Sequence, residues 1–125
     1  MARLLKQAEA KRLGLPGRVS LEPVSGEIGS RVSFRIARIA VPQPSDKPRG
    51  PHLHRDFEEC IYVLSGRGTM HTESGEYPVR PGDILLVPAD EKHMTLNTGS
   101  EPLVLLCFFP TADVSGGTTE FASFE

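Results

Sequence analysis

Glycine and proline interrupt this chain so often that long helices have little room. The 125 residues include 12 glycines and 11 prolines, well above their combined usual share of about 12 %. They do not cluster in one linker but separate short runs rich in apolar and β-branched residues. Short strands joined by such turns are typical of an all-β sandwich or barrel. The length indicates one domain, large enough to bury a core without disulfide staples.

The sequence predicts one short helix and several strands between these interruptions. Residues 3–13 could form the helix, ended by Gly14 and Pro16. The segment 43–51 is a loop that cannot pair, because four of its nine residues are proline or glycine. A hairpin turn is expected at 73–76, where Gly75 can adopt positive φ, and the tail 115–125 could add an edge strand. The remaining strands are predicted at 31–41, 60–64, 69–72, 77–79, 84–87, 94–97 and 103–109, the last apolar enough to be buried on both faces.

Charge and cysteine content narrow the possible partners and compartment. The net charge is −2 with no basic block, so nucleic acid and membrane surfaces are not expected partners. No segment approaches the roughly 20 apolar residues of a membrane span, and the N-terminus lacks the apolar run of a secretion signal. Cys60 and Cys107 lie in apolar segments, so we expect free thiols in a reducing cytoplasm, with a disulfide between them as the alternative.

Three of the four histidines form the first functional pattern. His52 and His54 lie two residues apart and would share one face of a strand. Glu59 would point to the other face unless the chain bends or bulges within residues 55–58. His93 supplies a third imidazole from a distant segment. Three imidazoles and one carboxylate form a plausible transition-metal site.

The spacing around the histidine pair resembles the first signature motif of the cupin superfamily. That motif reads G-x5-H-x-H-x3,4-E-x6-G. The chain matches it from His52 and His54 through Glu59 to Gly66, with Asp46 where the leading glycine is usual. The spacing to Gly66 selects Glu59 over its neighbour Glu58.

The second cupin motif, G-x5-P-x-G-x2-H-x3-N, is also similar to a segment of this chain. Gly82, Pro88, His93 and Asn97 match it, and Asp90 replaces the middle glycine. Both departures from the cupin pattern fall at turn glycines, so they put local loop shape in question and not the ligand positions.

The resemblance implies a double-stranded β-helix, or jelly-roll, barrel at residues 31–125 with an N-terminal helix or arm at 1–30. It also implies one divalent transition metal (Mn, Fe, Ni, Co or Zn) held by His52, His54, Glu59 and His93. Neutral imidazoles suit these ions, and the carboxylate favours the harder ones. Two open positions on an octahedral ion could take water, dioxygen or a chelating substrate.

The cupin fold does not by itself fix a function, because it hosts many chemistries. The intact ligand set favours a metal-dependent enzyme, dioxygenase-like or oxidoreductase-like, that acts on a small oxygenated metabolite. The alternatives are a non-catalytic module that binds a small sugar or organic acid, and a sugar isomerase or lyase. The expected inward residues Phe57, Ile61, Val63 and Met70 are mostly apolar, which favours oxygen chemistry over isomerisation.

Several other polar residues have a simpler structural interpretation. Cys60 should point away from the metal, His71 should face solvent, Asp83 should stabilise a turn and Asn97 should hold a loop. The direction of Cys107 stays open because both faces of its strand are apolar.

The remaining predictions concern two arginines and the apolar side chains that do not fit on the inner faces of the strands. Arg35 and Arg38 lie on opposite faces of one strand, and solvent exposure is expected, although one of them could line the cavity and bind an anionic substrate. Surplus apolar side chains such as Tyr62 and Leu64 predict a homodimer. Residues 3–13 would dock on the partner or, alternatively, fold back on their own barrel.

Overall fold

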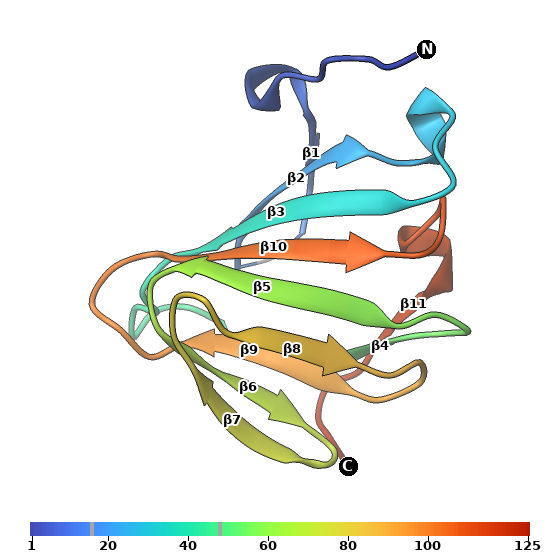
Figure 1. Ribbon diagram of the computed structural model, residues 1–125. Coiled ribbons are helices and arrows are strands. Elements are labelled where there is room, and N and C mark those ends of the chain that lie inside the picture. The colour runs from blue at the N-terminus through green and yellow to red at the C-terminus, as the bar shows by residue number, and fades with distance from the viewer. Residues whose placement is uncertain (16, 48) are drawn as a thin grey trace.

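The protein folds into two antiparallel β-sheets that face each other, as the computed structural model shows for residues 1–15, 17–47 and 49–125 (Figure 1). The first sheet has the strand order β1-β2-β3-β10-β5-β8, and the second has the order β11-β4-β9-β6-β7. The strands of the first sheet are Lys11–Leu13 (β1), Val19–Val24 (β2), Ser33–Ile39 (β3), Leu103–Phe109 (β10), Glu59–Ser65 (β5) and Ile84–Val87 (β8). Those of the second are Thr118–Glu120 (β11), His52–His54 (β4), His93–Asn97 (β9), Gly68–Thr72 (β6) and Gly75–Val79 (β7).

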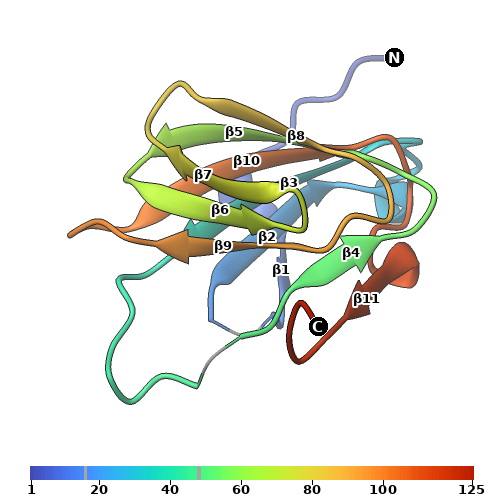
Figure 2. The same ribbon diagram turned by 90° about the horizontal axis from the view of Figure 1, so that it is seen from below.

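The chain alternates between the two layers, which Figure 2 shows from the side of the second sheet. It passes from β3 in the first sheet to β4 in the second, and then back to β5 and over again to β6. This wrapping confirms the predicted all-β jelly-roll architecture. Strands from both sides of the predicted boundary between residues 30 and 31 pair in the first sheet, where Ser20 of β2 lies opposite Ala37 of β3.

Most predicted strands are confirmed to within a few residues, but the predicted N-terminal helix is wrong. Only one 3₁₀ turn, η1 (Gln7–Glu9), forms there, and β1 follows it. Leu13 of β1 pairs with Ser20 of β2 in the same chain, as in the alternative that this segment folds back on its own barrel. An isolated short helix has a costly nucleus, whereas pairing with β2 gives Lys11–Leu13 backbone hydrogen bonds to a neighbouring strand. Pro16 and Pro48, assigned to the helix end and to the loop 43–51, lie outside the described residues.

The predicted turn and tail features are confirmed. Gly75 has φ +152° at the start of β7, directly after the turn at residues 73–74, and β11 is an edge strand of the second sheet. The turn 3₁₀ helices η2 (Gly26–Ile28) and η3 (Ser115–Gly117) complete the regular structure of the described residues. None of the described helices has the length and apolar character needed to cross a membrane.

Strand β10 is buried on one face, which corrects the prediction that both faces are covered. Leu103, Leu105, Cys107 and Phe109 point inward, whereas Phe108 on the outer face is 47 % exposed. The apolar run allowed two covered faces, but Val104 and Leu106 on the outer face are only half-buried and Phe108 is exposed.

The barrel interior changes from apolar to polar along its strands. Val63, Met70, Leu103 and Leu105 are at most 2 % exposed, and burial of such side chains is the main favourable contribution to folding. Toward the other end of β5, the inward position is taken by Glu59. The apolar part therefore supports the fold, and the polar part forms a candidate site.

Candidate metal centre

Four side chains selected from the sequence meet inside the barrel: His52, His54, Glu59 and His93. One possible ligand atom from each lies within 4.8 Å of all the others. His54, Glu59 and His93 are buried, and His52 is half-buried. The donor types suit a divalent transition metal, so the group could hold one ion.

The backbone around β4 explains this convergence. His52 and His54 share the inner face of β4, and His52 is the register partner of His93 on β9. Asp56 adopts a left-handed conformation with φ +68°, which confirms the bend predicted within residues 55–58. The bend turns Glu59 to the same side as the histidines.

Asp90 shows how the chain replaces a glycine of the second motif. Its φ is +67°, a conformation that aspartate tolerates better than most residues. Its backbone N–H donates to the carbonyl oxygen of His54 at 2.8 Å. The substitution therefore keeps the turn and ties the segment before His93 to β4.

Two histidine rings are held by acceptors behind them. The hydroxyl of Thr118 donates to the carbonyl oxygen of Val114 at 2.7 Å, so it can accept from Nδ1 of His54 at 2.9 Å. Nδ1 of His93 donates to the carbonyl oxygen of Glu91 at 3.0 Å. Both rings then present Nε2 to Oε1 of Glu59, each at 3.0 Å.

The charges of this group depend on one another. Burial alone would raise the pKa of Glu59, but the hydrogen bonds from His54 and His93 outweigh it and hold that pKa below its usual range. Burial opposes protonation of His93, yet its hydrogen bond to Glu59 raises the pKa of that ring. Burial, followed by the charge of His93, lowers the pKa of His52 to about 2. His52 is therefore a neutral ligand at ordinary pH.

The donor set fits a bound cation. With Nδ1 acting as donor, a neutral imidazole offers a lone pair at Nε2. Two such lone pairs aimed at one carboxylate oxygen repel it unless a proton or a metal ion lies between them. The raised pKa of His93 favours a proton between its Nε2 and Glu59, and a divalent metal would relieve the repulsion of both rings at once. Rear hydrogen bonds of the kind made by Thr118 and Glu91 are common behind metal-bound histidines.

A cavity of about 330 Å³ lies beside His52, His54 and Glu59, and its wall is partly apolar, as expected, with Leu15, Ala37 and Phe109 among its lining residues. Ile61, Val63 and Met70 point inward as predicted, but they belong to the apolar core. The cavity is lined by His52, His54 and Glu59 together with Arg18, Ser20, Arg35, Arg49, Cys107, Ser115, Thr118 and Glu120, among others. Three arginines therefore share the space next to the candidate metal centre with apolar side chains, and no arginine was expected to be the main feature of this wall.

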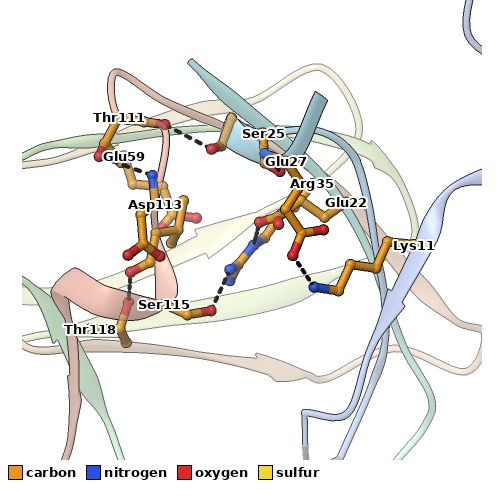
Figure 3. Close-up of polar contacts among 12 residues, drawn as sticks. Lys11, Glu22, Ser25, Glu27, Arg35, Glu59, Thr111, Asp113, Ser115 and Thr118 are labelled. Atoms are coloured by element: carbon orange, nitrogen blue, oxygen red, sulfur yellow. Dashed lines mark hydrogen bonds and ion pairs between the residues drawn. The ribbon is translucent and has the colours of Figure 1, made fainter. Parts of the chain in front are cut away.

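Arg35 is buried, which corrects the expectation of solvent exposure, whereas Arg38 is exposed as predicted. Nε of Arg35 donates to Glu22 at 2.7 Å, and Nη2 of Arg35 donates to Ser115 at 3.1 Å. Figure 3 shows Arg35 between these two partners. Its guanidinium also lies 5.6 Å from the centre of the Phe109 ring. Arg35 therefore acts mainly as a structural link across the barrel.

Arg18 and Arg49 line the cavity but were not selected from the sequence. Arg18 directly precedes β2, and Arg49 lies in the segment before β4. Burial, and then the charge of Arg49, lowers the pKa of Arg18 to about 10, so both remain positively charged at neutral pH. Alternation from the buried Ser20 could have indicated Arg18, but no local pattern pointed to Arg49.

The cysteine predictions are confirmed and completed. Both cysteines are free. Cys60 faces outward, as predicted, beside Phe108. Cys107 points into the cavity, where burial and then the charge of Glu59 raise its pKa well above its usual range. Cys107 is therefore a neutral thiol.

The predictions for Asn97 and Asp83 agree with the structure, whereas His71, which was expected to face solvent, is half-buried. Asn97 donates to the carbonyl oxygens of Ile39 and Glu101 and accepts from the N–H of Gly99. Asp83 accepts from the N–H of Arg80 at 2.9 Å in a turn. His71 stays outside the four-residue group and contacts the exposed Glu76.

A protein-family model described as "Cupin domain" matches residues 39–109, which include all four residues of the candidate metal centre. This chain belongs to the cupin family. Among curated relatives of this cupin, glucose-6-phosphate isomerase of Thermococcus gammatolerans is 41 % identical over 64 residues, covering 47 % of this chain and 34 % of the relative. The chain spans less than half the length of the first curated relatives it matches.

Solved structures support the fold of this cupin. Oxalate decarboxylase of Lactobacillus farciminis matches with a TM-score of 0.74 at 20 % identity, over 91 % of this chain and 34 % of the other. A putative sugar phosphate isomerase of Acidithiobacillus ferrooxidans matches with a TM-score of 0.59 at 31 % identity, over 81 % and 67 %.

Proposed function

We propose that this cupin is a metal-dependent enzyme that acts on a small oxygenated metabolite. The observation that carries the proposal is the convergence of His52, His54, Glu59 and His93 beside a charged cavity. A purely structural ion would not require a cavity next to it. A bound divalent ion would act there as a Lewis acid toward an oxygen donor of the ligand.

The protein's own residues supply orientation and charge around that ion. Thr118 and Glu91 hold the rings of His54 and His93. The pair of Arg35 and Glu22 keeps the cavity wall in place. The neutral thiol of Cys107 is a poor nucleophile, because the thiolate is the reactive form.

The reaction type is a separate part of the proposal. A dioxygenase-like reaction was favoured by an expected apolar wall, and the three arginines in the partly apolar lining weaken that support. The relatives carry the names of a sugar-phosphate isomerase and a decarboxylase, and both names describe proteins with small anionic substrates. We therefore keep the reaction open among oxidation, cleavage and isomerisation.

Metal content tests the first step. Protein purified without a histidine tag and without added metal should contain about one transition-metal ion per chain, measured by plasma mass spectrometry. A His54→Ala/His93→Ala double variant should lose it, whereas His71→Ala should retain it. Equal metal content in all three proteins would contradict the proposal.

Turnover tests the second step. Oxygen uptake, carbon dioxide release and isomer formation are measured with small phenols, diketones, organic acids and sugar phosphates. Turnover that disappears in the double variant supports an enzyme. Metal-dependent binding without turnover of any of these would instead support a non-catalytic binding module.

We also propose that two copies pair through the outer face of the first sheet. Leu64, Ile84 and Leu86 are 52 %, 66 % and 57 % exposed. In the same face, the rings of Phe34 and Phe108 stack with centroids 4.8 Å apart. Exposed apolar patches of this kind are commonly interaction sites, and a two-fold axis would let the patch cover itself.

Sedimentation equilibrium at micromolar concentration tests the dimer. The expected mass is twice the 13.6 kDa of one chain. A Leu86→Glu variant should shift the mass toward the monomer, whereas Leu96→Glu, at a 38 % exposed position on the second sheet, should not. A monomer mass throughout for the unmodified protein would exclude the dimer.

A further inference from the structure

Two arginines in the cavity carry buried donors that the fold does not use. Nε of Arg18 and Nη1 of Arg49 are inaccessible to solvent and have no hydrogen-bond partner among the described residues. Both side chains line the same cavity as His52, His54 and Glu59. Buried charged donors are ordinarily paired, because leaving them unpaired is costly.

Arg35 provides an internal comparison. It lines the same cavity, yet Glu22 and Ser115 accept its hydrogen bonds. Within residues 1–15, 17–47 and 49–125, the side chain of Arg49 has one partner, Glu120, whose Oε1 lies 3.2 Å from Nη2 and whose side chain is 53 % exposed. This contact leaves Nη1 of Arg49 unused. Among the described residues, Arg35 therefore makes two side-chain hydrogen bonds and Arg49 makes one, whereas the buried Nε of Arg18 has no partner.

The chemistry of these donors selects an anion. A guanidinium has five N–H donors and no acceptor, and its planar fork matches the oxygens of a carboxylate or a phosphate. The two charges also repel each other, since the charge of Arg49 disfavours protonation of Arg18. An oxyanion between them would satisfy the donors and remove the repulsion. A neutral sugar hydroxyl could accept one hydrogen bond but could not offset the charge.

We propose that Arg18 and Arg49 form an anion subsite that holds the carboxylate or phosphate group of a small ligand in the cavity beside the His52/His54/Glu59/His93 group. The volume of about 330 Å³ restricts the ligand to a small molecule. That this ligand is the substrate rests on the proposed function. Anion binding itself uses only the arginines and needs no metal.

Calorimetric titration of metal-free protein at low salt tests the subsite. The probes are malonate, inorganic phosphate and the neutral analogue malonamide. We expect an anion to bind and malonamide not to bind. Arg18→Gln and Arg49→Gln should each weaken anion binding about tenfold or more, because each removes a charged hydrogen bond. Arg38→Gln, at an exposed position on β3, should leave it unchanged. The tighter of the two anions identifies the oxyanion class.

Thermal unfolding separates a binding role from a structural one. In the absence of anion, Arg18→Gln should not lower the melting temperature, because the buried Nε that it removes has no partner among the described residues. It should abolish the rise that the anion causes in the unmodified protein. If that variant does not fold, Arg18→Lys, which keeps the charge but not the fork, replaces it and should show weakened binding.

Other outcomes would overturn the subsite. The subsite would be excluded if neither anion bound, or if Arg18→Gln and Arg49→Gln bound the anion as tightly as the unmodified protein. It would also be excluded if Arg38→Gln weakened anion binding as much as those two variants. Because the protein is metal-free throughout, a failed metal analysis leaves this result unaffected. Likewise, failed anion binding leaves the metal centre and its turnover assay intact.

Discussion

His52 and His93 face each other across β4 and β9, with ring centroids 4.3 Å apart. They come from segments 41 positions apart, and their registered pairing makes the group compact. Each ring nevertheless has a different charge preference, because burial keeps His52 neutral while Glu59 favours protonation of His93. This asymmetry leads to testable behaviour of the metal-free protein.

Acid should destabilise the metal-free protein through His52. The unfolded His52 gains a proton near pH 6.5, whereas the folded one does so only near pH 2, so stability is full above 6.5 and falls with pH between these values. The raised pKa of His93 means that its contribution to the free energy of unfolding is lost only as pH rises above 6.5. The lowered pKa of Glu59 means that its contribution is lost only as pH falls below about 4.5. Between pH 6.5 and 4.5 we expect a loss of at most about 2 kcal/mol from His52.

Urea unfolding at the two pH values measures this loss. His52→Asn should show a smaller loss than the unmodified protein, and His71→Asn should behave like the unmodified protein. An identical pH dependence in His52→Asn would contradict the assignment of His52 as a buried neutral ring.

Removing the hydroxyl of Thr118 should weaken metal binding without touching a ligand. Thr118→Val keeps the shape of the side chain but removes the acceptor for Nδ1 of His54. Loss of such a rear hydrogen bond typically lowers metal affinity about 10- to 100-fold. Competition with a chromogenic chelator measures the change. The control is Thr119→Val, whose hydroxyl contacts Arg55 instead. Equal affinity in both variants would show that Thr118 does not position the ring.

The two thiols should react at very different rates. Cys60 is half-buried on the outer face, whereas Cys107 is buried with a raised pKa, and reactivity follows the thiolate. In native protein at pH 8, a disulfide reagent should therefore modify Cys60 first. Cys60→Ser should remove the fast reaction and Cys107→Ser should preserve it.

Denatured, unreduced protein should yield both thiols, because neither cysteine is in a disulfide. No reactive thiol in that sample would show that a disulfide forms, and similar native rates would place Cys107 outside the cavity.

Asn97 should be needed for stability and not for metal binding. Asn97→Asp removes the donors to Ile39 and Glu101 and buries a charge against their carbonyl oxygens. We expect a loss of about 3 kcal/mol or more in the free energy of unfolding, measured by urea titration. Thr98→Ala, at the exposed neighbouring position, should change it by less than about 0.5 kcal/mol. An unchanged free energy of unfolding in Asn97→Asp would contradict the role of Asn97 in holding the loop.

The strands and the metal-centre residues were predictable because their patterns are local. Alternation along 59–63 placed Glu59, Ile61 and Val63 on one face, and the spacing from His52 to Asn97 matched two motifs. The bend at Asp56 could be predicted because Glu59 would otherwise have faced away. The N-terminal helix failed because β1 depends on a ladder with β2, and that ladder is not visible in residues 3–13 alone.

The sequence by itself determined the all-β class, most strands and the four residues of the candidate centre. The tertiary structure decided which face of each strand points inward. Alternation could separate Arg35 from Arg38 but could not say that Arg35 is the buried one. Only barrel closure brings Arg18 and Arg49, 31 positions apart, into one cavity with Glu59. The physical reason is that side-chain alternation is a property of one strand, whereas a cavity is formed by strands that meet only when both sheets pack.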